Sequence, residues 1–538
     1  MGRVANLTFR AALATAAMIG PARAADVSIV ALDGSRTTIG ELQVIEDGAF
    51  VLKTRSGIQR FSQDLHVCLG RTCPADQSGP TDFGITAPPS LVEVLLPLTL
   101  EGYVSASEGM AFFLNDLGRP IPASSEGIIL DLVPPDGGVP DFEVRLRTFE
   151  GEKLANVVIR PPVGESIFTA LAEEDAQIAV SASVASDAEA DLVRRAGGGD
   201  LRDPGQARVI ALDGYAIISN PDNPIASISL PEAAAVLAGQ ITNWSALGGA
   251  DLPIAVYSLP TDSDAFENVE KRILGPAGRQ LRADARIVDT PRALAVAVAT
   301  DPAGIGVTSY SRKRNNHAIP LEGSCGMVVL PTPFTIKTEE YGLQTRILAY
   351  NRADIAPEAR GLLEFIGGTA VDGVVAKSGL VNLSIIPEAP ENRILRIRAA
   401  LEPADTPVSG DALRQMMQDM LESTRLSTTF RFSAGSTLLD NKALRDLARV
   451  ANHIAEHKPR RVVLAGFADA AGAFDQNTRL SLLRAESVLE QLRATAGRSA
   501  VAGVEIVARG FGELAPVACN DTPEGRATNR RVEVWVEY

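Results

Sequence analysis

Strand-like and helix-like segments alternate along the middle of this chain, from about residue 91 to residue 386. Short runs rich in Val, Ile and Leu are followed by longer stretches in which apolar residues recur at helical spacing. This alternation predicts an α/β architecture. Nearly 300 residues exceed what one compact lobe usually takes, so we expect two lobes. The strand-like runs are VEVLLPLTL, LANVVIR, AQIAVSA, ARVIALDGYAIIS, PIAVYS, ARIV, AGIGVTSY and TRILAYN.

The flanks of this middle region have a different pattern. Residues 25–77 contain short strand-like runs separated by Gly and Asp, which predict a small β module, and residues 78–90 form a Gly- and Pro-containing linker. Breaker-rich joints at 386–392 and 402–407 precede the C-terminal segment, residues 408–538. The fold expected for the whole chain is therefore multidomain, combining α/β and α+β parts.

The C-terminal segment predicts an α+β unit. An amphipathic helix is followed by the strand TTFRFS, a helix from about Asp440, the strand RVVLAGF, a second helix, and the strands GVEIVARGF and RRVEVWVEY. In the helix that begins near Asp440, we expect one core stripe at helical spacing, made of Leu444, Leu447, Ala448, Ala451, Ile454 and Ala455.

The N-terminus predicts export. Arg3 and Arg10 flank the start of a short apolar run, residues 11–20, and an A-x-A pattern ends at Ala24. We interpret residues 1–24 as a signal peptide, because the run is shorter than the roughly 20 residues that span a bilayer. No later stretch is long and apolar enough to span one, so we expect a soluble, exported protein.

Export places the cysteines in an oxidising compartment. Cys68 and Cys73 lie in VCLGRTCP, where Gly and Pro favour a turn, and we expect a small-loop disulfide between them. Cys325 and Cys519 lie in segments assigned to different domains, and we expect both to be unpaired and buried. One close cysteine pair does not make a zinc site, so no metal is expected.

The formal charge of −15 and the pI near 5.0 exclude nucleic acid and anionic membrane surfaces as main partners, because both need a basic field. His453 and His457 are spaced four residues apart, but they lie on the helix face opposite the expected core stripe, so a metal pair is not expected. Nucleophile, Walker, zinc-protease and dinucleotide motifs are missing from this sequence, so neither an enzyme nor a cofactor is expected.

One pair of opposite charges stands out in the C-terminal segment. In GFADAAGAFDQNTRLSLLRAESV, Asp469 follows an apolar strand-like run and Arg484 lies fifteen residues later. Together with RVVLAGFAD and ARGFGELAPVACNDTPEGRATNRRVEVWV, this stretch makes residues 425–538 resemble the OmpA-like peptidoglycan-binding domain. The resemblance implies that Asp469 and Arg484 hold the diaminopimelate of the cell-wall peptide.

The chemistry of the two side chains agrees with this role. A carboxylate accepts from an ammonium, and a planar guanidinium binds a carboxylate, at about 1.5–3 kcal/mol per charge-assisted contact. The expected core stripe of the second helix passes through Leu482, Ala485, Val488, Leu489 and Leu492. Arg484 lies a quarter turn off that stripe, so we expect it to reach past the edge of the core towards the loop of Asp469. The alternative is a plain Asp469–Arg484 salt bridge.

One departure from the family pattern is visible beside Asp469. Where the family has Gly-His-Thr-Asp, this chain has a Phe at 467 and an Ala at 468, so a hydroxyl is lost. Asn477 and Arg526 are candidate secondary contacts to peptidoglycan. Arg526, Asn529 and Arg530 in GRATNRR match the family, although Arg526 could equally pack against the last strand.

The middle region resembles periplasmic phosphate-binding proteins, the solute receptors of phosphate ABC importers. The similarity is carried by IALDGYAIISNPDNPIASISLPEAAAVLAGQITNWSALGGADLPIAVYS, by EGSCGMVVLPTPFTIKTEEYGLQTRILAYN and by ARGLLEFIGGTAVDGVVAKSGLVN, and it covers residues 91–386. It implies two α/β lobes joined by crossover strands. An oxyanion between the lobes would be held by Ser and Thr hydroxyls and by N–H groups at helix N-termini.

The loop expected to bind that oxyanion departs from the family. A Ser-Gly-Thr loop is expected near SLPTDSDAFENVEKRIL, but this chain has Asp262-Ser263-Asp264-Ala265. A carboxylate and a methyl group replace a Gly and a Thr hydroxyl, which disfavours phosphate. Ser263 stays a candidate contact.

The remaining cleft candidates are serines. Where the family has a Ser-Arg pair, this chain has Ser181-Ala182-Ser183, so the guanidinium is absent and Ser181 and Ser183 are left as candidate contacts. Ser105 and Ser107 could cap a helix and face the cleft, or act as plain N-caps without a ligand.

These patterns predict an exported, non-enzymatic protein that binds peptidoglycan through its C-terminal domain and carries a solute-receptor-like module for phosphate or another small anion. The alternative is a structural or sensing protein of the cell envelope whose module is degenerate and binds a protein partner. An ABC importer or another envelope protein is the expected partner class. We expect a periplasmic, cell-wall-associated location, at or near the outer membrane. A cell-wall hydrolase is a third class, and no motif supports it.

Overall fold

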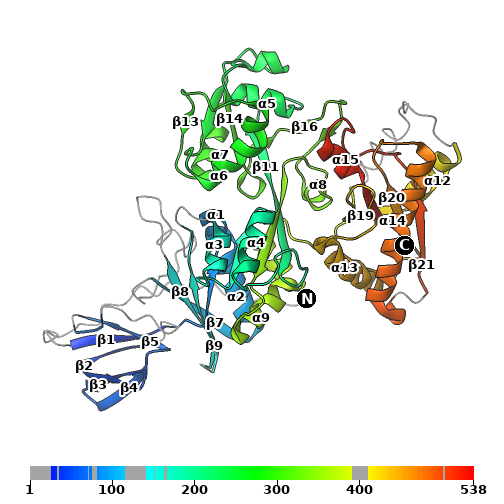
Figure 1. The fold of residues 1–538 in the computed structure, drawn as a ribbon. Helices are drawn as coiled ribbons and strands as arrows, with labels where there is room; N and C mark the ends of the chain where they lie inside the picture. Colours follow the sequence, from blue (N-terminus) through cyan, green and yellow to red (C-terminus); the bar gives the residue numbers. More distant parts are fainter. Residues whose placement is uncertain are drawn as a thin grey trace, which may run out of the picture. The chain divides into compact units, whose positions relative to one another are not determined.

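The computed structural model describes residues 26–32, 36–70, 72–74, 81–115, 141–150, 152–162, 166–389, 410–500 and 503–538 (Figure 1). The predicted signal peptide and the joint at 402–407 lie outside these residues. The described residues form two compact units. One contains those up to Asp82 and those of Glu108–Val158, and the other contains those of Phe83–Ser107 and Ile159–Tyr538. None of the described helices has the length and apolar character needed to cross a membrane.

The first unit begins with a five-stranded antiparallel sheet in the order β4-β3-β2-β1-β5. Phe50 and Leu52 are buried in its small core, and a disulfide joins Cys68 to Cys73. A further set of strands, in which β7 and β8 pair antiparallel, belongs to the same unit. The strands are β1 (Asp26–Ala31), β2 (Thr37–Glu46), β3 (Ala49–Thr54), β4 (Gly57–Ser62), β5 (His66–Leu69), β7 (Gly109–Asn115), β8 (Phe142–Thr148) and β9 (Lys153–Ile159).

The second unit contains a two-lobed domain, described over residues 83–107 and 159–389. In its first lobe, β10 pairs parallel with β6 and antiparallel with β18. The strands of this lobe are β6 (Phe83–Thr86), β10 (Ile178–Ser181) and β18 (Gln344–Asn351). Its helices are α1 (Pro89–Val94), α2 (Leu96–Ala106), α3 (Ile167–Ala172), α4 (Asp187–Arg195), α9 (Pro357–Gly367) and α10 (Val371–Lys377).

The second lobe contains β12 (Ala255–Ser258), β13 (Arg286–Ile287), β14 (Gly304–Ser309), β15 (His317–Ala318), α5 (Leu230–Leu237), α6 (Asp264–Val269) and α7 (Pro291–Thr300). Helix α5 starts at a capping box, in which Ser229 accepts from the backbone of Glu232 and the Glu232 carboxylate accepts in return. Beyond this lobe come β16 (Leu321–Glu322), β17 (Val328–Val329) and α8 (Pro333–Lys337).

One long strand, β11 (Ala207–Ser219), connects the two lobes (Figure 1). Its first part pairs with β18 from Ala207 to Gly214, and its last part pairs with β14 from Tyr215 to Ser219. Because strands in both lobes hydrogen-bond to the same chain segment, the lobes are joined through a crossover strand, as the sequence predicted.

The C-terminal domain, described over residues 410–538, contains a four-stranded sheet in the order β19-β22-β20-β21. Successive residues of β20 alternate between two buried faces: Val462 and Leu464 belong to one core, and Val463 and Ala465 belong to the other. The elements are α12 (Gly410–Glu422), β19 (Thr424–Arg431), α13 (Asn441–His457), β20 (Arg461–Phe467), α14 (Phe474–Ala500), β21 (Glu505–Gly510), α15 (Pro523–Asn529) and β22 (Arg531–Glu537).

The expected core stripe of α13 is partly wrong. Leu444, Ala448 and Ala455 are exposed, whereas Ala443 and Val450 are buried. Successive residues of a helix are about 100° apart around its axis. The face of α13 that packs against the sheet is the one that carries Val450, and the three exposed residues lie on a different face. The predicted residues Leu447, Ala451 and Ile454 are buried.

Candidate functional site

Asp469 lies two residues beyond the end of β20, in the loop that leads to α14. Its Oδ2 is 2.7 Å from Nη1 of Arg530, and its Oδ1 accepts from the backbone N–H of Ala471 at 3.1 Å. The side chains of Asp469 and Arg530 are 13% and 14% exposed, so this ion pair lies at the surface of the domain but is largely shielded from water.

Arg484 on α14 is fully buried, so the expectation that it reaches past the edge of the core is wrong. Its Nε donates to the carbonyl of Ser436 at 3.0 Å and its Nη2 donates to the carbonyl of Ser433 at 3.3 Å. Its guanidinium lies 5.4 Å from the ring centre of Phe432. The third nitrogen, Nη1, is enclosed and has no hydrogen-bond partner among the described residues.

The burial of Arg484 has a packing cause. A Cβ at Gly466 of β20 would lie 2.0 Å from the backbone oxygen of Ser481 on α14, so the strand and the helix approach more closely than any side chain would permit. This approach brings the Arg484 side chain beneath the loop between β19 and α13, whose carbonyls it binds.

The electrostatics place Asp469, Arg484 and Arg530 in one group. Burial lowers the pKa of Arg484 to about 10, with Arg530 lowering it further and Asp469 opposing both. The alternative of a plain Asp469–Arg484 salt bridge is wrong, because Asp469 is paired with Arg530. From the sequence, Arg530 was noted as a match to the family but was given no role. The run TNRR was the one sequence feature that pointed to this residue.

The two candidate secondary contacts have other partners. Asn477 donates to the backbone oxygen of Asp469 at 3.1 Å and to the carboxylate of Glu513 at 2.6 Å. Arg526 donates to the carbonyl of Asn520 at 2.9 Å. Both side chains therefore hold loops around the Asp469–Arg530 pair.

The hydroxyls of Ser107, Ser181 and Ser263 in the two-lobed domain make local hydrogen bonds. Ser105 and Ser107 lie at the C-terminal end of α2, where the helix dipole disfavours an anion, so the N-cap expectation for them is wrong. The hydroxyl of Ser181 accepts from the N–H of Ser183 at 3.0 Å. Ser263 caps the short helix α6 by accepting from the N–H of Phe266 and donates to a backbone carbonyl.

A disulfide joins Cys325 to Cys519, so the expectation that both are unpaired and buried is wrong. Cys325 lies between β16 and β17 and is exposed, and Cys519 lies in the loop before α15. The two residues are 194 positions apart, with Cα atoms 5.6 Å from each other. Assigning the cysteines to separate domains had suggested that they could not meet, but docking of the two domains brings them together.

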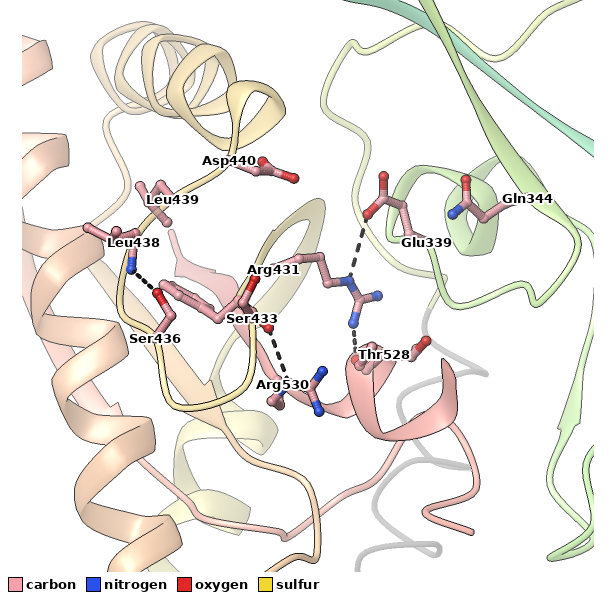
Figure 2. Close-up of a pocket in the computed structure, with 12 residues that line it drawn as sticks. Glu339, Gln344, Arg431, Ser433, Ser436, Leu438, Leu439, Asp440, Thr528 and Arg530 are labelled. Carbon is pink, nitrogen blue, oxygen red and sulfur yellow. Dashed lines mark hydrogen bonds and ion pairs between the residues drawn. The ribbon is translucent and has the colours of Figure 1, made fainter. Parts of the chain in front are cut away.

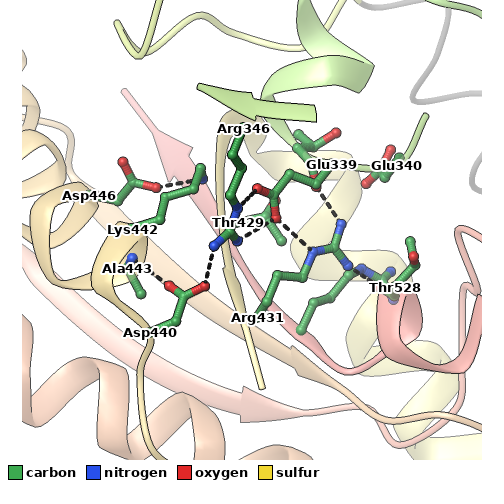
Figure 3. Close-up of polar contacts among 12 residues, drawn as sticks. Glu339, Glu340, Arg346, Thr429, Arg431, Asp440, Lys442, Ala443, Asp446 and Thr528 are labelled. Carbon is green, nitrogen blue, oxygen red and sulfur yellow. Dashed lines mark hydrogen bonds and ion pairs between the residues drawn. The ribbon is translucent and has the colours of Figure 1, made fainter. Parts of the chain in front are cut away.

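Ion pairs add to this connection between the two-lobed domain and the C-terminal domain (Figure 3). Arg346 binds both carboxylate oxygens of Glu339, at 2.6 and 3.0 Å, and reaches Asp440 at 2.8 Å. Arg431 lies 3.8 Å from Glu339 and donates to the carbonyl of Thr338. The positive neighbours of Glu339 lower its pKa to about 2 against the opposing effect of its own burial.

Comparison with known proteins assigns both domains. Residues 148–365 match the profile of the PBP superfamily domain, and residues 431–530 match that of the OmpA family. The chain therefore contains a PBP-like domain and an OmpA-like domain. The two profiles cover separate parts of the chain, in the order that the sequence motifs predicted.

Curated relatives match a part of this chain. Outer membrane porin F of Pseudomonas fluorescens is 34% identical over 113 residues, which are 21% of this chain and 33% of the porin. Peptidoglycan-binding protein ArfA of Mycobacterium tuberculosis (strain H37Rv) is 42% identical over 90 residues, 17% of this chain and 26% of ArfA. The chain thus spans about a third or less of the length of these two relatives.

Among solved structures, this chain is similar to an ABC-type phosphate transport receptor from Vibrio cholerae. The match covers 56% of this chain and 99% of the receptor, at 18% identity and a TM-score of 0.39. The OmpA-like domain of FopA1 from Francisella tularensis covers 21% of this chain and 71% of that domain, at 22% identity and a TM-score of 0.18.

Proposed function

We propose that this chain is a non-enzymatic protein of the cell envelope that binds peptidoglycan through its OmpA-like domain. The group recognised is the side-chain end of diaminopimelate, which carries both an ammonium and a carboxylate. The observation that carries the proposal is Nη1 of Arg484, an enclosed donor without a partner among the described residues. Leaving such a donor unsatisfied costs about 1–3 kcal/mol, and a ligand carboxylate would remove that cost.

Asp469 supplies the other half of the proposed site. In the free protein its carboxylate is paired with Arg530. A ligand ammonium takes over Asp469, and Arg530 then turns to the ligand carboxylate together with Arg484. One ion pair is exchanged for three charge-assisted contacts that match a zwitterion.

The similarity to ArfA, which is named as a peptidoglycan-binding protein, supports this assignment. The similarity to an outer membrane porin supports a location in the envelope, and we propose that the protein is periplasmic and associated with the cell wall.

The proposal is tested by co-sedimentation of the full chain with purified peptidoglycan. Asp469→Asn removes the charge that receives the ammonium, and Arg484→Lys keeps a charge but loses the planar fork. We expect each change to weaken binding by about 10- to 100-fold, the equivalent of one charge-assisted contact. Arg493→Lys, an exposed position farther along α14, is the matched control and should bind as the wild type does. Unchanged sedimentation of both site variants would refute the assignment.

For the PBP-like domain we propose the role of a rigid scaffold that holds the OmpA-like domain, in place of a phosphate receptor. The disulfide and the ion pairs between the two domains support this role, and so do the local hydrogen bonds of Ser181 and Ser263. Calorimetric titration of the full chain with inorganic phosphate should give no binding heat. Micromolar binding of phosphate would contradict the scaffold role and favour an anion receptor.

A further inference from the structure

The Cys325–Cys519 disulfide attaches the loop before α15 to the hairpin of β16 and β17 in the PBP-like domain. The hairpin is shaped around this bond. A Cβ at Gly323 would lie 2.5 Å from Sγ of Cys519, and the N–H of Cys325 donates to the same sulfur at 3.1 Å. A hydrogen bond from Ser324 to Asp521 lies beside the disulfide. The hairpin therefore holds the loop at residues 519–521.

Helix α15 packs directly on this loop. A Cβ at Gly525 would lie 1.9 Å from the backbone oxygen of Cys519, so the helix and the loop approach more closely than any side chain would permit. Arg526 donates to the carbonyls of Asn520 and Asp521, at 2.9 and 3.1 Å. The loop and the helix therefore form one packed body, which the disulfide attaches to the PBP-like domain.

Arg530 of the proposed site directly follows this body in the chain. Asn529, the last residue of α15, is fully buried; its Oδ1 accepts from two N–H groups of the preceding loop, and its Nδ2 donates to Oδ1 of Asn520 at 2.9 Å. Figure 2 shows Arg530 beside Thr528 at the end of α15, on the wall of a cavity of about 500 Å³. The position of the Arg530 guanidinium, which pairs with Asp469, is thus tied to the cysteine loop.

The same oxygen of Asn520 reaches the loop of Asp469. It accepts from the N–H of Ala470 at 3.2 Å as well as from Asn529. Ala470 directly follows Asp469, so this bond fixes the backbone from which the Asp469 carboxylate projects. One acceptor atom, next to Cys519 in the chain, therefore connects the cysteine loop to both halves of the Asp469–Arg530 pair.

The cysteine loop has little buried surface of its own to hold it in place. Residues 521–524 are exposed, and Cys519 and Asn520 are only half-buried. A second connection to the PBP-like domain runs through Arg431, which donates to the carbonyls of Thr528 and Thr338, but it holds the other end of α15. Opening the disulfide therefore loosens the loop, and a ligand then has to order the loop when it binds.

We infer that the Cys325–Cys519 disulfide preorganises the zwitterion site, with Asn520 as the positioning residue that connects the cysteine loop to Asp469 and Arg530. With the disulfide closed, both charged side chains are held in place before the ligand arrives. The affinity for peptidoglycan then depends on the redox state of this bond. This inference rests on the proposed function and adds to it a role for the PBP-like domain in setting the affinity.

The test measures the apparent Kd of the full chain for purified peptidoglycan by co-sedimentation, before and after treatment with excess dithiothreitol. Each protein disulfide is reduced to two thiols while dithiothreitol is oxidised to its cyclic disulfide, and a thiol count confirms the reduction. We expect reduction to weaken binding by about 10-fold, the effect of ordering one or two side chains and their loop on binding.

The two disulfides provide matched variants. The double change Cys325→Ser, Cys519→Ser should show the same loss of affinity without reductant, and no further loss with it. The double change Cys68→Ser, Cys73→Ser keeps the bond between the domains, so it should bind as the wild type does and still respond to the reductant.

Asn520 is tested in the oxidised protein. Asn520→Ala should weaken binding by about 10-fold, and reduction of this variant should add little, because both changes break the same connection. Asn520→Asp keeps an acceptor oxygen and should retain most of the binding. A disulfide that stabilised the fold without positioning the site would instead give losses that multiply.

The outcomes separate this inference from the proposed function. If the oxidised wild type binds peptidoglycan and reduction leaves its Kd unchanged, preorganisation by the disulfide is wrong and peptidoglycan binding stands. Losses that multiply in reduced Asn520→Ala also overturn it. If the oxidised wild type does not bind, the proposed function fails and this inference fails with it. Tryptophan fluorescence checks that each protein is folded; if the reduced protein is not, Asn520→Ala in the oxidised protein decides.

Discussion

Removal of the Cys325–Cys519 disulfide should destabilise the second unit by an amount that follows from the chain separation. The two cysteines are 194 residues apart, and a cross-link of that span removes about 5 kcal/mol of loop-closure entropy from the unfolded chain. Native disulfides typically contribute about 2–4 kcal/mol, so we expect the double change Cys325→Ser, Cys519→Ser to lower the free energy of unfolding by about 2–5 kcal/mol.

The PBP-like domain and the OmpA-like domain each contain one tryptophan that can serve as a spectroscopic probe. Its two tryptophans are Trp244 in the PBP-like domain and Trp535 in the OmpA-like domain, and each is 1% exposed. Urea unfolding of Trp244→Phe and Trp535→Phe backgrounds therefore reports on one domain at a time. We expect coincident transitions when the disulfide is present, and lower, separated midpoints in the double serine variant.

The other disulfide provides the matched control. Cys68 and Cys73 are 5 residues apart and lie in the first unit, which has no tryptophan. Replacing both with Ser should therefore leave the two tryptophan transitions unchanged. If removing the Cys325–Cys519 disulfide shifts neither transition by more than about 0.5 kcal/mol, the reasoning that this cross-link joins the two domains is refuted.

Two further predictions concern Asp213 and Gly466. Burial raises the pKa of Asp213 from 3.8 to about 6. The stability that Asp213 contributes is therefore full below about pH 4 and is lost as the pH rises through 6. The change in the free energy of unfolding is about 3 kcal/mol. Urea unfolding at pH 4 and pH 7 should show that Asp213→Asn removes this pH dependence. Gly466→Ala should lower the free energy of unfolding by about 2 kcal/mol or more, because its Cβ would meet the backbone of Ser481 at 2.0 Å. Gly373→Ala in helix α10 is the control, because no atom lies within 4 Å of the added Cβ, and this change should stabilise the protein by about 0.5–1 kcal/mol. If both changes destabilise the protein by the same amount, the packing argument is contradicted.

Much of the fold follows from local patterns. The alternation of strand-like and helix-like runs predicted an α/β region, and β11 joins two lobes there. The motifs around Asp469 and Arg484 predicted the OmpA-like domain, which a family profile matches over residues 431–530. Periodicity alone did not orient α13 correctly, because several apolar arcs are compatible with one sequence and the sheet selects among them.

The residues of the candidate site were proposed from the sequence, and their contacts could not be predicted from it. Sequence reasoning brought Asp469 and Arg484 to one region, yet it could not assign Arg530 as the ion-pair partner of Asp469. That pair joins residues 61 positions apart, on elements that meet only after the sheet has formed. The carbonyls that bind Arg484 are also remote in the chain, and backbone groups carry no sequence signature.

The sequence by itself determined the order and type of the domains, because helical and strand periodicity and the motif spacings are local properties of the chain. Only the tertiary structure decided that Cys325 meets Cys519, and that Arg484 is buried with one nitrogen that has no partner among the described residues. These features arise from the docking of one domain on another, where shape and charge complementarity act between residues about a hundred or more positions apart.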